Sequence, residues 1–331
     1  MSFFKISNRR YTGSKQKLSK WIVETINNEI NLNSFFDIFA GTACVSTNFT
    51  NIDKLIINDF LFSNNIIYKA FFNSKKYSFD KLVKLQTKFN SFDPDKIKTN
   101  YFSNNFGEKY FSLNDSKKIG KIRENIENIN INNDEKNILL ASLLYSADKS
   151  ANTVGHYDAY IKNKKIYDKF SFNLIEPLKP DAKVEIYRED GNILAEKINS
   201  DVVYIDPPYN SRQYSRFYHL LENLAQWKKP KLHGTALKPD PENISDYCKT
   251  SAPKSLADLI NKLQCKMIVL SYNNTYKSKS SSSKNKITLD QIKNILEKKG
   301  KTKILKKDHA HFNAGKTKFD NHQEYLFLTK I

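Results

Sequence analysis

The stretch Asp201-Val-Val-Tyr-Ile-Asp-Pro-Pro-Tyr209 carries the clearest information about the fold. Its β-branched and aromatic run from Val202 to Ile205 predicts a short strand that is buried on both faces of a sheet. The strand ends at Asp206, because the two prolines that follow can neither continue a helix nor donate to a sheet ladder. In open α/β sheets, ligands bind at the carboxyl ends of the strands. The sequence therefore predicts a carboxylate, a rigid backbone and an aromatic ring at such an edge.

The residues of this corner suit transfer of a group to an aromatic amine. The exocyclic amine of adenine is a poor nucleophile, because its lone pair is delocalised into the ring. The carboxylate of Asp206 and the carbonyl of Pro207, both directed at the N–H hydrogens, would favour a localised lone pair and bind more strongly as positive charge develops. Tyr209 is placed to stack on the base. An ordinary strand-ending turn is the alternative that the motif alone leaves open.

The composition predicts a nucleic-acid partner. The 331-residue chain carries a formal net charge of +19, which favours binding to a polyanion. Part of this charge reflects a composition crowded with Lys, Asn, Ile, Phe and Tyr. The six arginines are more informative, because arginine makes bidentate contacts with guanine and phosphate. Arg212 and Arg216 directly follow the Asp206 corner, which makes them candidates for such contacts.

Nothing in the sequence predicts export, membrane insertion or a metal site. The amino terminus becomes charged at once and lacks an apolar segment of signal-peptide length. The longest apolar run, at 138–145, is too short to span a bilayer. Cys44, Cys248 and Cys265 are few, odd in number and not closely paired, which argues against a disulfide framework or a zinc site. We therefore expect buried free thiols in a protein of the reducing cytoplasm.

Two further segments predict a nucleotide-binding sheet. Phe35–Ala43 is an apolar strand that opens into a turn of small residues and then a short helix over 45–49, and such a turn lets a cofactor approach the backbone. Leu55–Asp59 is a second strand with an acid at its end, where ribose hydroxyls are commonly bound. The other interpretation of Asp59, as an N-cap for a helix at 62–72, does not exclude this role.

The segment before the first helix gives a weaker signal for anion binding. Asn8–Lys15 leads into a helix with apolar residues at helical spacing over 18–30, and Ser14 is its predicted N-cap. Gly13 leaves room for an anion close to the backbone, and Lys15 adds a positive charge. Many helices begin in this way, so the segment carries little weight alone.

Together these segments resemble the alpha group of N6-adenine DNA methyltransferases, which includes the orphan DNA adenine methylases and many partners of restriction endonucleases. One departure is Ala43, where the family's turn usually ends in glycine. The resemblance covers most of the chain and follows the order of its motifs, which are Tyr11-Thr-Gly-Ser-Lys15, Asp37-Ile-Phe-Ala-Gly41, Asn58-Asp59 and Asp206-Pro-Pro-Tyr209.

The resemblance implies S-adenosyl-L-methionine as the methyl donor. It places Asp190, which follows a predicted strand at 184–188, on the adenine amino group of this cofactor. The other cofactor-binding residues that it implies are Tyr11, Gly13, Lys15, Phe39, Gly41, Asp59 and Asp206.

Helical patterns without a nucleotide-binding turn occupy residues 74–180, and the family keeps its target-recognition region in an insertion of this size. We therefore expect a catalytic domain of residues 1–73 and 181–331 and a helical recognition insertion between them. The loop at 149–165 mixes amides, aromatics and cations, which suits contacts with base edges and phosphates. A solvated polar loop is the alternative, and His156 is not expected to be catalytic. The residues predicted to bind DNA are Lys149, Asn152, Tyr157, Lys164, Lys165, Arg212 and Arg216.

The rest of the chain completes an α/β fold. We expect a Rossmann-like methyltransferase sheet of seven largely parallel strands with an antiparallel last strand. Residues 228–253 are Pro- and Lys-rich and are a second candidate for DNA contact, and residues 273–286 have the composition of a linker. Further helices are predicted at 119–129, 138–145, 214–225, 256–263 and 289–299, and further strands at 266–272, 303–307 and 324–330, the last two joined by a basic loop at 309–322.

With the resemblance, the site predicts direct, in-line transfer of the sulfonium methyl group to adenine N6 in duplex DNA. A base inside the stack cannot reach a strand end, so the target adenine must flip out, at a cost of roughly a few kcal/mol. We expect a monomer on DNA and no metal.

Two alternatives remain. One is the same chemistry on RNA adenine or on cytosine N4, although cytosine enzymes usually carry Ser where Asp206 stands. The other is a non-catalytic, basic nucleic-acid-binding protein. The sequence leaves open the recognition site and whether a cognate restriction endonuclease is encoded nearby.

Overall fold

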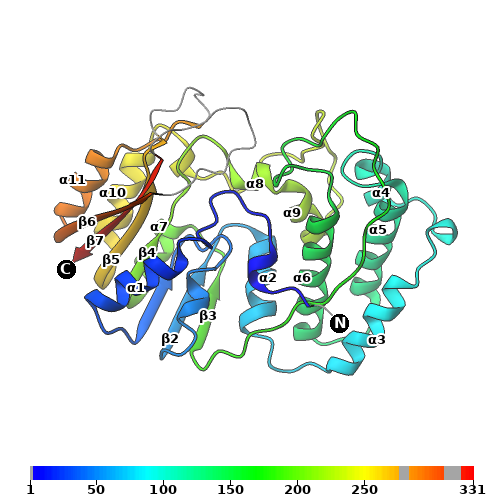
Figure 1. Ribbon diagram of the computed structural model, residues 1–331, viewed down its shortest axis with the longest axis horizontal. Coiled ribbons are helices and arrows are strands. Elements are labelled where there is room, and N and C mark those ends of the chain that lie inside the picture. Colours follow the sequence, from blue (N-terminus) through cyan, green and yellow to red (C-terminus); the bar gives the residue numbers. More distant parts are fainter. Residues whose placement is uncertain (1–2, 276–282, 309–321) are drawn as a thin grey trace. The chain divides into compact units, whose positions relative to one another are not determined.

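The computed structural model describes residues 3–275, 283–308 and 322–331, and the chain divides into two compact units (Figure 1). The division into units describes structure and not function. The role of residues 74–180 in target recognition therefore stays a prediction. The helical unit comprises Met1–Gly13, Leu61–Lys179 and Ser215–Glu242, and the sheet unit comprises Ser14–Phe60, Pro180–Tyr214 and Asn243–Ile331.

The described residues of the sheet unit form a seven-stranded sheet in the order β3-β2-β1-β4-β5-β7-β6 (Figure 1). Strands β1 to β5 run parallel to one another, whereas β7 is antiparallel to both β5 and β6. The predicted α/β sheet with an antiparallel last strand is confirmed. The strands are β1 (Ser34–Asp37), β2 (Lys54–Asn58), β3 (Lys183–Tyr187), β4 (Asn199–Ile205), β5 (Gln264–Asn273), β6 (Lys301–Asp308) and β7 (Gln323–Lys330).

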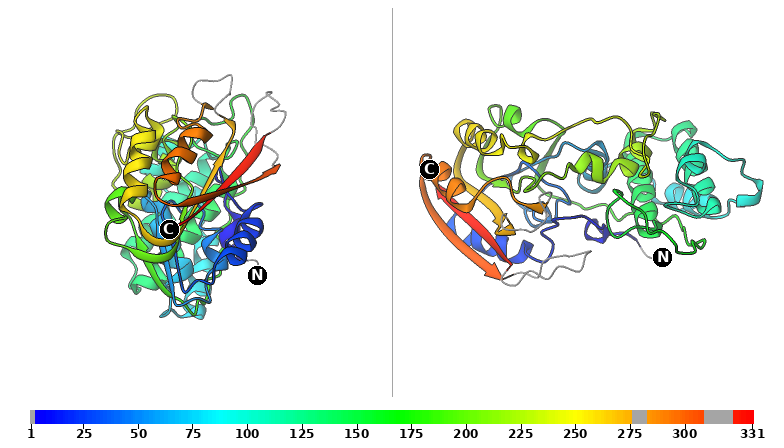
Figure 2. Two further views of the ribbon diagram at one scale, coloured as in Figure 1. Left: turned by 90° about the vertical axis from the view of Figure 1, so that its left-hand side faces the viewer. Right: turned by 90° about the horizontal axis from the view of Figure 1, so that it is seen from above.

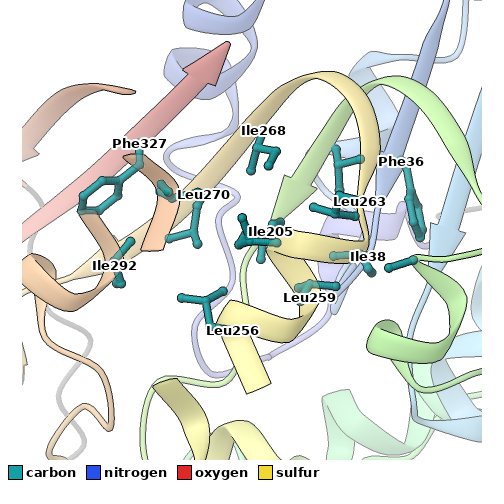
Figure 3. Close-up of a cluster of buried hydrophobic side chains, with 14 of the residues drawn as sticks. Phe36, Ile38, Ile205, Leu256, Leu259, Leu263, Ile268, Leu270, Ile292 and Phe327 are labelled. Atoms are coloured by element: carbon teal, nitrogen blue, oxygen red, sulfur yellow. The ribbon is translucent and has the colours of Figure 1, made fainter. Parts of the chain in front are cut away.

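Helices cover both faces of this sheet, and central strands buried on two faces are continuously apolar. Phe36, Val203 and Ile268 stand in register across β1, β4 and β5, and they belong to the core beneath α7, α10 and α11 (Figure 3). On the opposite face lies α1, whose Ile22 and Ile26 are fully buried (Figure 2). The helices of this unit are α1 (Ser19–Glu29), α7 (Gly191–Leu194), α10 (Ala252–Lys262) and α11 (Leu289–Glu297), with short 3-10 turns at η2 (Ser46–Asn48) and η4 (Asp246–Cys248).

Several predicted boundaries differ from the structure for local reasons. Ser14 is not the N-cap of α1, because a turn precedes the helix and Leu18 occupies the cap position without a side-chain bond. Within the strand and turn predicted at 35–43, the strand already ends at Asp37, and Gly41 and Ala43 in the turn both adopt a φ of 54°, a left-handed conformation that a strand cannot contain. The short helix after it is only the 3-10 turn η2.

The helical unit is built around α6, which is buried along most of its length from Ile138 to Asp148. The helices predicted at 119–129 and 138–145 are confirmed as parts of α5 and α6, and residues 151–182 form no named helix or strand. The helix predicted at 214–225 is two helices, α8 and α9. The helices are α2 (Phe62–Phe72), α3 (Phe79–Asn90), α4 (Tyr101–Phe106), α5 (Leu113–Asn128), α6 (Asn133–Ser150), α8 (Tyr214–Phe217, which begins one residue before this unit) and α9 (His219–Gln226), with 3-10 turns at η1 (Ile6–Asn8) and η3 (Pro94–Lys96).

No helix within the described residues has the length and apolarity needed to cross a membrane. The described ranges also contain no group of three or more His, Cys, Asp or Glu side chains that could hold a metal ion. All three cysteines lie in those ranges as free thiols, with Cys44 and Cys248 buried and Cys265 half-buried. The predicted burial of the thiols is therefore confirmed for two of them. The predicted loop at 309–321 and residues 276–282 of the predicted linker lie outside the described residues.

Candidate active site

Acidic side chains gather at one edge of the sheet. Asp37, Asp59 and Asp206 stand at or just beyond the carboxyl ends of β1, β2 and β4, which are neighbouring parallel strands. Because β7 is antiparallel, its first residues lie at the same edge, and Glu324 pairs with the last residue of β5, Asn273. All four carboxyl groups belong to the sheet unit.

Lys15 and Tyr209 bind the carboxylate of Asp206. The Lys15 Nζ atom lies 2.9 Å from Asp206 Oδ1 and donates to the Tyr209 hydroxyl at 2.8 Å. The Tyr209 hydroxyl in turn donates to the same Oδ1 atom. Both hydrogen bonds that reach this carboxylate from the described part of the chain therefore lie on Oδ1, which leaves Oδ2 as an acceptor for a ligand.

The side chains of this network are largely removed from water, with exposed fractions of 4% for Lys15 and 16% for Asp206. Burial raises the pKa of Asp206, and the Lys15 charge and the Tyr209 hydrogen bond oppose that shift. Burial also disfavours the charged form of Lys15, but the nearby Asp206 and Glu324 carboxylates outweigh it and raise the Lys15 pKa. The ammonium therefore stays charged and stabilises the ionised form of Asp206.

The Tyr209 ring packs against another ring of the sheet unit. Its centroid lies 4.4 Å from that of Tyr272, at an interplanar angle of 56°, and Lys15 Nζ lies 4.9 Å from it. The Tyr209 carbonyl accepts from the backbone N–H of Lys286 at 2.7 Å, which fixes the turn after the prolines. The sequence predicted only a stacking role for Tyr209, whereas the structure adds a hydroxyl that donates to the Asp206 carboxylate.

The turn after β1 is joined to the end of β2. The Gly41 N–H donates to Asp59 Oδ2 at 2.9 Å, and the Asn58 amide donates to the Ile38 carbonyl at 3.0 Å. Ala43 keeps the left-handed φ of 54° that favours glycine, so the departure from the family pattern leaves a glycine-like backbone in place. The carboxylate of Asp59 thus lies beside a turn whose Gly41 is half-buried and whose Ala43 is fully buried.

The N-cap interpretation of Asp59 is wrong. The N-cap of α2 is Leu61, and the first N–H groups of this helix, on Phe62 and Ser63, donate instead to the Glu222 carboxylate at 3.0 and 2.7 Å. This carboxylate neutralises the positive end of the helix dipole. The ligand role predicted for Asp59 from its position at the end of β2 therefore does not compete with a role as the cap of this helix.

Asp190 and Phe39 extend this edge on the side of β3. The Asn58 amide also donates to the Glu189 carbonyl at 3.1 Å, which ties the segment after β3 to β2. Asp190 caps α7 by accepting from the Asn192 N–H at 2.8 Å. A methyl group added at Gly191 would meet the Phe39 ring at 3.2 Å, so the backbone of α7 approaches this ring closely. Phe39, Gly41, Asp59 and Asp190 therefore form one continuous region beside Asp206.

Two predicted cofactor residues, Tyr11 and Gly13, belong to the helical unit. The Tyr11 ring is stacked on Tyr218 with centroids 4.6 Å apart and planes 5° from parallel, and the Arg9 guanidinium lies 5.0 Å from the Tyr11 centroid. Gly13 has a φ of 79°, which requires glycine. Tyr218 was not predicted from the sequence, and no motif marks it.

The predicted DNA-binding residues fall into two groups in the structure. Asn152 and Tyr157 are buried in the helical unit: the Asn152 amide donates to the Lys109 and Ile161 carbonyls at 3.0 and 2.9 Å, and the Tyr157 hydroxyl donates to Asp148 at 2.9 Å. The others have accessible side chains. They are Lys149, Lys164, Lys165 and Arg216 in the helical unit and Arg212 in the sheet unit.

The fold and this edge define an α/β methyltransferase. A sequence model of the D12 class N6 adenine-specific DNA methyltransferases matches residues 11–304. The chain belongs to this family, and the resemblance drawn from its motifs is confirmed. It is an adenine-specific DNA methyltransferase.

Two of the relatives match this chain over nearly their whole length, and a third matches it over less than half. The type II methyltransferase M.NlaIII of Neisseria lactamica is 31% identical over 96% of this chain and 98% of its own. The type II methyltransferase M.CviAII of Paramecium bursaria Chlorella virus 1 is 31% identical over 97% of this chain and 98% of its own. The modification methylase StsI of Streptococcus sanguinis is 35% identical over 80% of this chain but only 44% of its own length.

Proposed function

We propose that the protein uses S-adenosyl-L-methionine to methylate adenine N6 at a specific site in duplex DNA, as the modification enzyme of a restriction-modification system. The observation that carries this proposal is the Asp206 network, in which Lys15 and Tyr209 occupy Oδ1 and leave Oδ2 at the sheet edge. The names of the relatives, which are type II methyltransferases and modification methylases, support the restriction-modification role.

The residues present fit S-adenosylmethionine. The left-handed turn at Gly41 allows close approach of a ligand to the backbone, Asp59 would accept from ribose hydroxyls, and Asp190 would accept from the cofactor's adenine amino group. When bound, this cofactor supplies an electrophilic methyl group on a sulfonium. The acidic edge suits a cationic donor, because carboxylates stabilise a nearby positive charge.

The chain's own groups would activate the target amine. Asp206 Oδ2 and the Pro207 carbonyl accept its two N–H hydrogens, which keeps the nitrogen lone pair out of the ring. Both acceptors are preorganised, and they stabilise the positive charge that develops on nitrogen. A buried corner can receive the base only after it flips from the duplex. Holding the reacting atoms in line contributes about 7–11 kcal/mol in well-oriented systems, so positioning carries much of the catalysis.

The test is sequencing of genomic DNA from a host that lacks adenine methylation and expresses this protein. We expect methylated adenines in one short sequence context, and none with Asp206→Ala, whose folding is verified by circular dichroism. Methylation confined to RNA, or at cytosine, or undiminished methylation by Asp206→Ala would overturn the proposal. Digestion of the extracted DNA with endonucleases that cut the same sequence context would show whether methylation protects the DNA from cleavage.

The cofactor assignment has a separate test by calorimetry. Asp59→Ala should weaken S-adenosylmethionine binding by about tenfold or more, because a lost hydrogen bond to a charged group is worth about 1.5–3 kcal/mol, and it should leave DNA affinity nearly intact. Equal cofactor affinity in the wild type and the variant would refute the role of Asp59.

A further inference from the structure

A fourth carboxyl group of the sheet edge has no role in the proposed reaction. Glu324 is the second residue of β7 and is only 5% exposed. Antiparallel pairing with Asn273 of β5 places it at the edge that holds Asp206. On the same strand, Tyr325 and Phe327 face the core under α10 and α11. Since side chains alternate along a strand, Glu324 faces the other side of the sheet, where Lys15 leads into α1.

The side chain of Glu324 is unusual because one of its carboxylate oxygens is buried without a hydrogen-bond partner among the described residues. Its Oε2 atom is inaccessible to water and has no partner among the described residues. Burial of an unpaired carboxylate is costly, and such groups are retained where a nearby charge or a ligand compensates for the loss of water. Here the compensating charge is Lys15, whose pKa is raised by Asp206 and then by Glu324, against the opposing effect of burial.

We propose that Glu324 is a positioning residue of the methyltransferase site, which shares the Lys15 ammonium with Asp206 and thereby keeps Asp206 a strong hydrogen-bond acceptor for the target amine. This inference rests on the proposed role of Asp206. With Asp206 as its only carboxylate, Lys15 would draw more electron density from that group. A second carboxylate that interacts with the ammonium weakens this pull while leaving the bond from Lys15 to Asp206 in place.

The position of Glu324 argues against direct contact with the cofactor. The cofactor residues proposed in the sheet unit, Phe39, Gly41, Asp59 and Asp190, lie along β1, β2 and β3. In the order of the sheet, β7 lies on the other side of β4, beyond β5. Glu324 and these residues thus flank Asp206 from opposite sides. A role through Lys15 is the one that the location supports.

The charges around Asp206 fix the sign of the expected pH effects. The groups that interact with its carboxylate are Lys15, the Tyr209 and Tyr204 hydroxyls, the Cys44 thiol and the carboxyl groups of Asp37 and Glu324. Glu324 is one of those that raise the pKa of Asp206, whereas Lys15 lowers it. Removal of the Glu324 charge should therefore make Asp206 ionise at lower pH and accept hydrogen more weakly. Removal of the Lys15 charge should have the opposite effect on ionisation.

The experiment measures the single-turnover rate of methylation of a cognate DNA duplex, with enzyme in excess, between pH 5 and pH 9. For Glu324→Gln we expect a maximal rate lower by about tenfold and an acidic limb shifted to lower pH by about one unit, a shift that corresponds to about 1.4 kcal/mol of differential interaction. Lys15→Met should shift the same limb to higher pH. Glu324→Asp, which keeps the charge, should restore most of the wild-type rate and profile.

Two controls distinguish a role of Glu324 through Lys15 from a general effect of removing a carboxylate and from a role in cofactor binding. Glu29→Gln removes another carboxylate of the sheet unit, one that pairs with Lys303 and Lys330 on the outer strands, and its pH profile should match that of the wild type. Calorimetry should show unchanged S-adenosylmethionine affinity for Glu324→Gln. An unshifted pH profile for Glu324→Gln, or a loss of its cofactor affinity instead, overturns the role of Glu324. The proposed function still stands in that case if the wild type is active and Asp206→Ala is inactive. An inactive wild type overturns both.

Discussion

At the scale of single residues, Asp37 is a buried acid whose protonation affects stability. It is 1% exposed, accepts from the Ser46 hydroxyl at 2.6 Å, and burial raises its pKa to about 8. A raised carboxyl pKa means that the folded protein holds a proton that the unfolded chain releases above pH ~4. This group therefore favours folding at low pH, and its contribution falls as the pH rises from ~4 to ~8.

The variant Asp37→Asn should remove this dependence, because an amide keeps the acceptor for Ser46 and cannot ionise. Relative to the wild type, we expect the free energy of unfolding of Asp37→Asn to rise by about 1.4 kcal/mol per pH unit between pH 5 and pH 7.5. Urea denaturation at several pH values measures it. A difference between the two proteins that stays constant with pH would show that Asp37 is ionised in the fold.

Tyr209 gives a second prediction at this scale, because its ring and its hydroxyl have separate tasks. Tyr209→Phe keeps the ring that packs on Tyr272 and loses the bond to Asp206 Oδ1. We expect a fall in the single-turnover rate of about tenfold, the equivalent of one hydrogen bond to a charged group. Tyr209→Ala should lose considerably more, since any stacking on the target base is lost too. Equal rates for the two variants would mean that the ring contributes nothing.

At the scale of elements, the loop after α6 depends on Asn152 for its shape. The Asn152 side chain joins the carbonyls of Lys109 and Ile161, which lie on opposite sides of it in the sequence. Asn152→Ala should lower the free energy of unfolding by about 1–3 kcal/mol, because both carbonyls lose a buried partner. Thermal unfolding measures this. Unchanged stability, together with a smaller difference in affinity between cognate and random DNA, would instead support the base contact predicted from the sequence.

The exposed lysines of the same loop should act differently. Lys164 and Lys165 lie on the surface, so Lys164→Ala with Lys165→Ala should leave stability unchanged. If these residues neutralise phosphates, the pair should weaken binding to all duplexes alike and flatten the salt dependence by roughly 0.9 for each phosphate that is no longer neutralised. Competition binding at two salt concentrations tests this. A selective loss of cognate binding would place these lysines at base edges.

The order of elements was largely predictable, whereas several side-chain roles were not. Apolar runs such as Val202–Ile205 mark buried strands, so the sheet and its acidic edge followed from the sequence. Composition cannot tell which way a loop residue points, and Asn152 and Tyr157 therefore appeared to be surface residues although they are buried. Glu324 is a lone acid at the start of a strand, and only the antiparallel register of β7 brings it to the site. The sequence did predict an antiparallel strand at 324–330, and this strand direction would have placed Glu324 at the same edge as Asp206.

At the scale of the whole molecule, the basic residues behind the formal net charge of +19 have more than one role. Several lysines are paired with acids within the fold, as are Lys54 and Lys183 on the two sides of Glu185. Lys15 pairs with Asp206 at the edge of the sheet. Only the remaining accessible cations are available for a polyanion. The total charge therefore overstates the DNA-binding surface, and the salt dependence of binding reports the number of neutralised phosphates more reliably than the composition does.

Some of the other lysines lie on strand β6, where they oppose pairing with a strand of another chain. Strand β6 is the last strand in the order of the described sheet, and its sequence Lys301-Thr-Lys-Ile-Leu-Lys-Lys-Asp308 is largely exposed. An open strand edge is a template on which another chain can add a strand, and lysines there discourage such pairing. A second copy of this strand would bring like charges together along its length. Part of the positive charge of this protein therefore protects it from self-aggregation, a role that would be needed even in the absence of DNA.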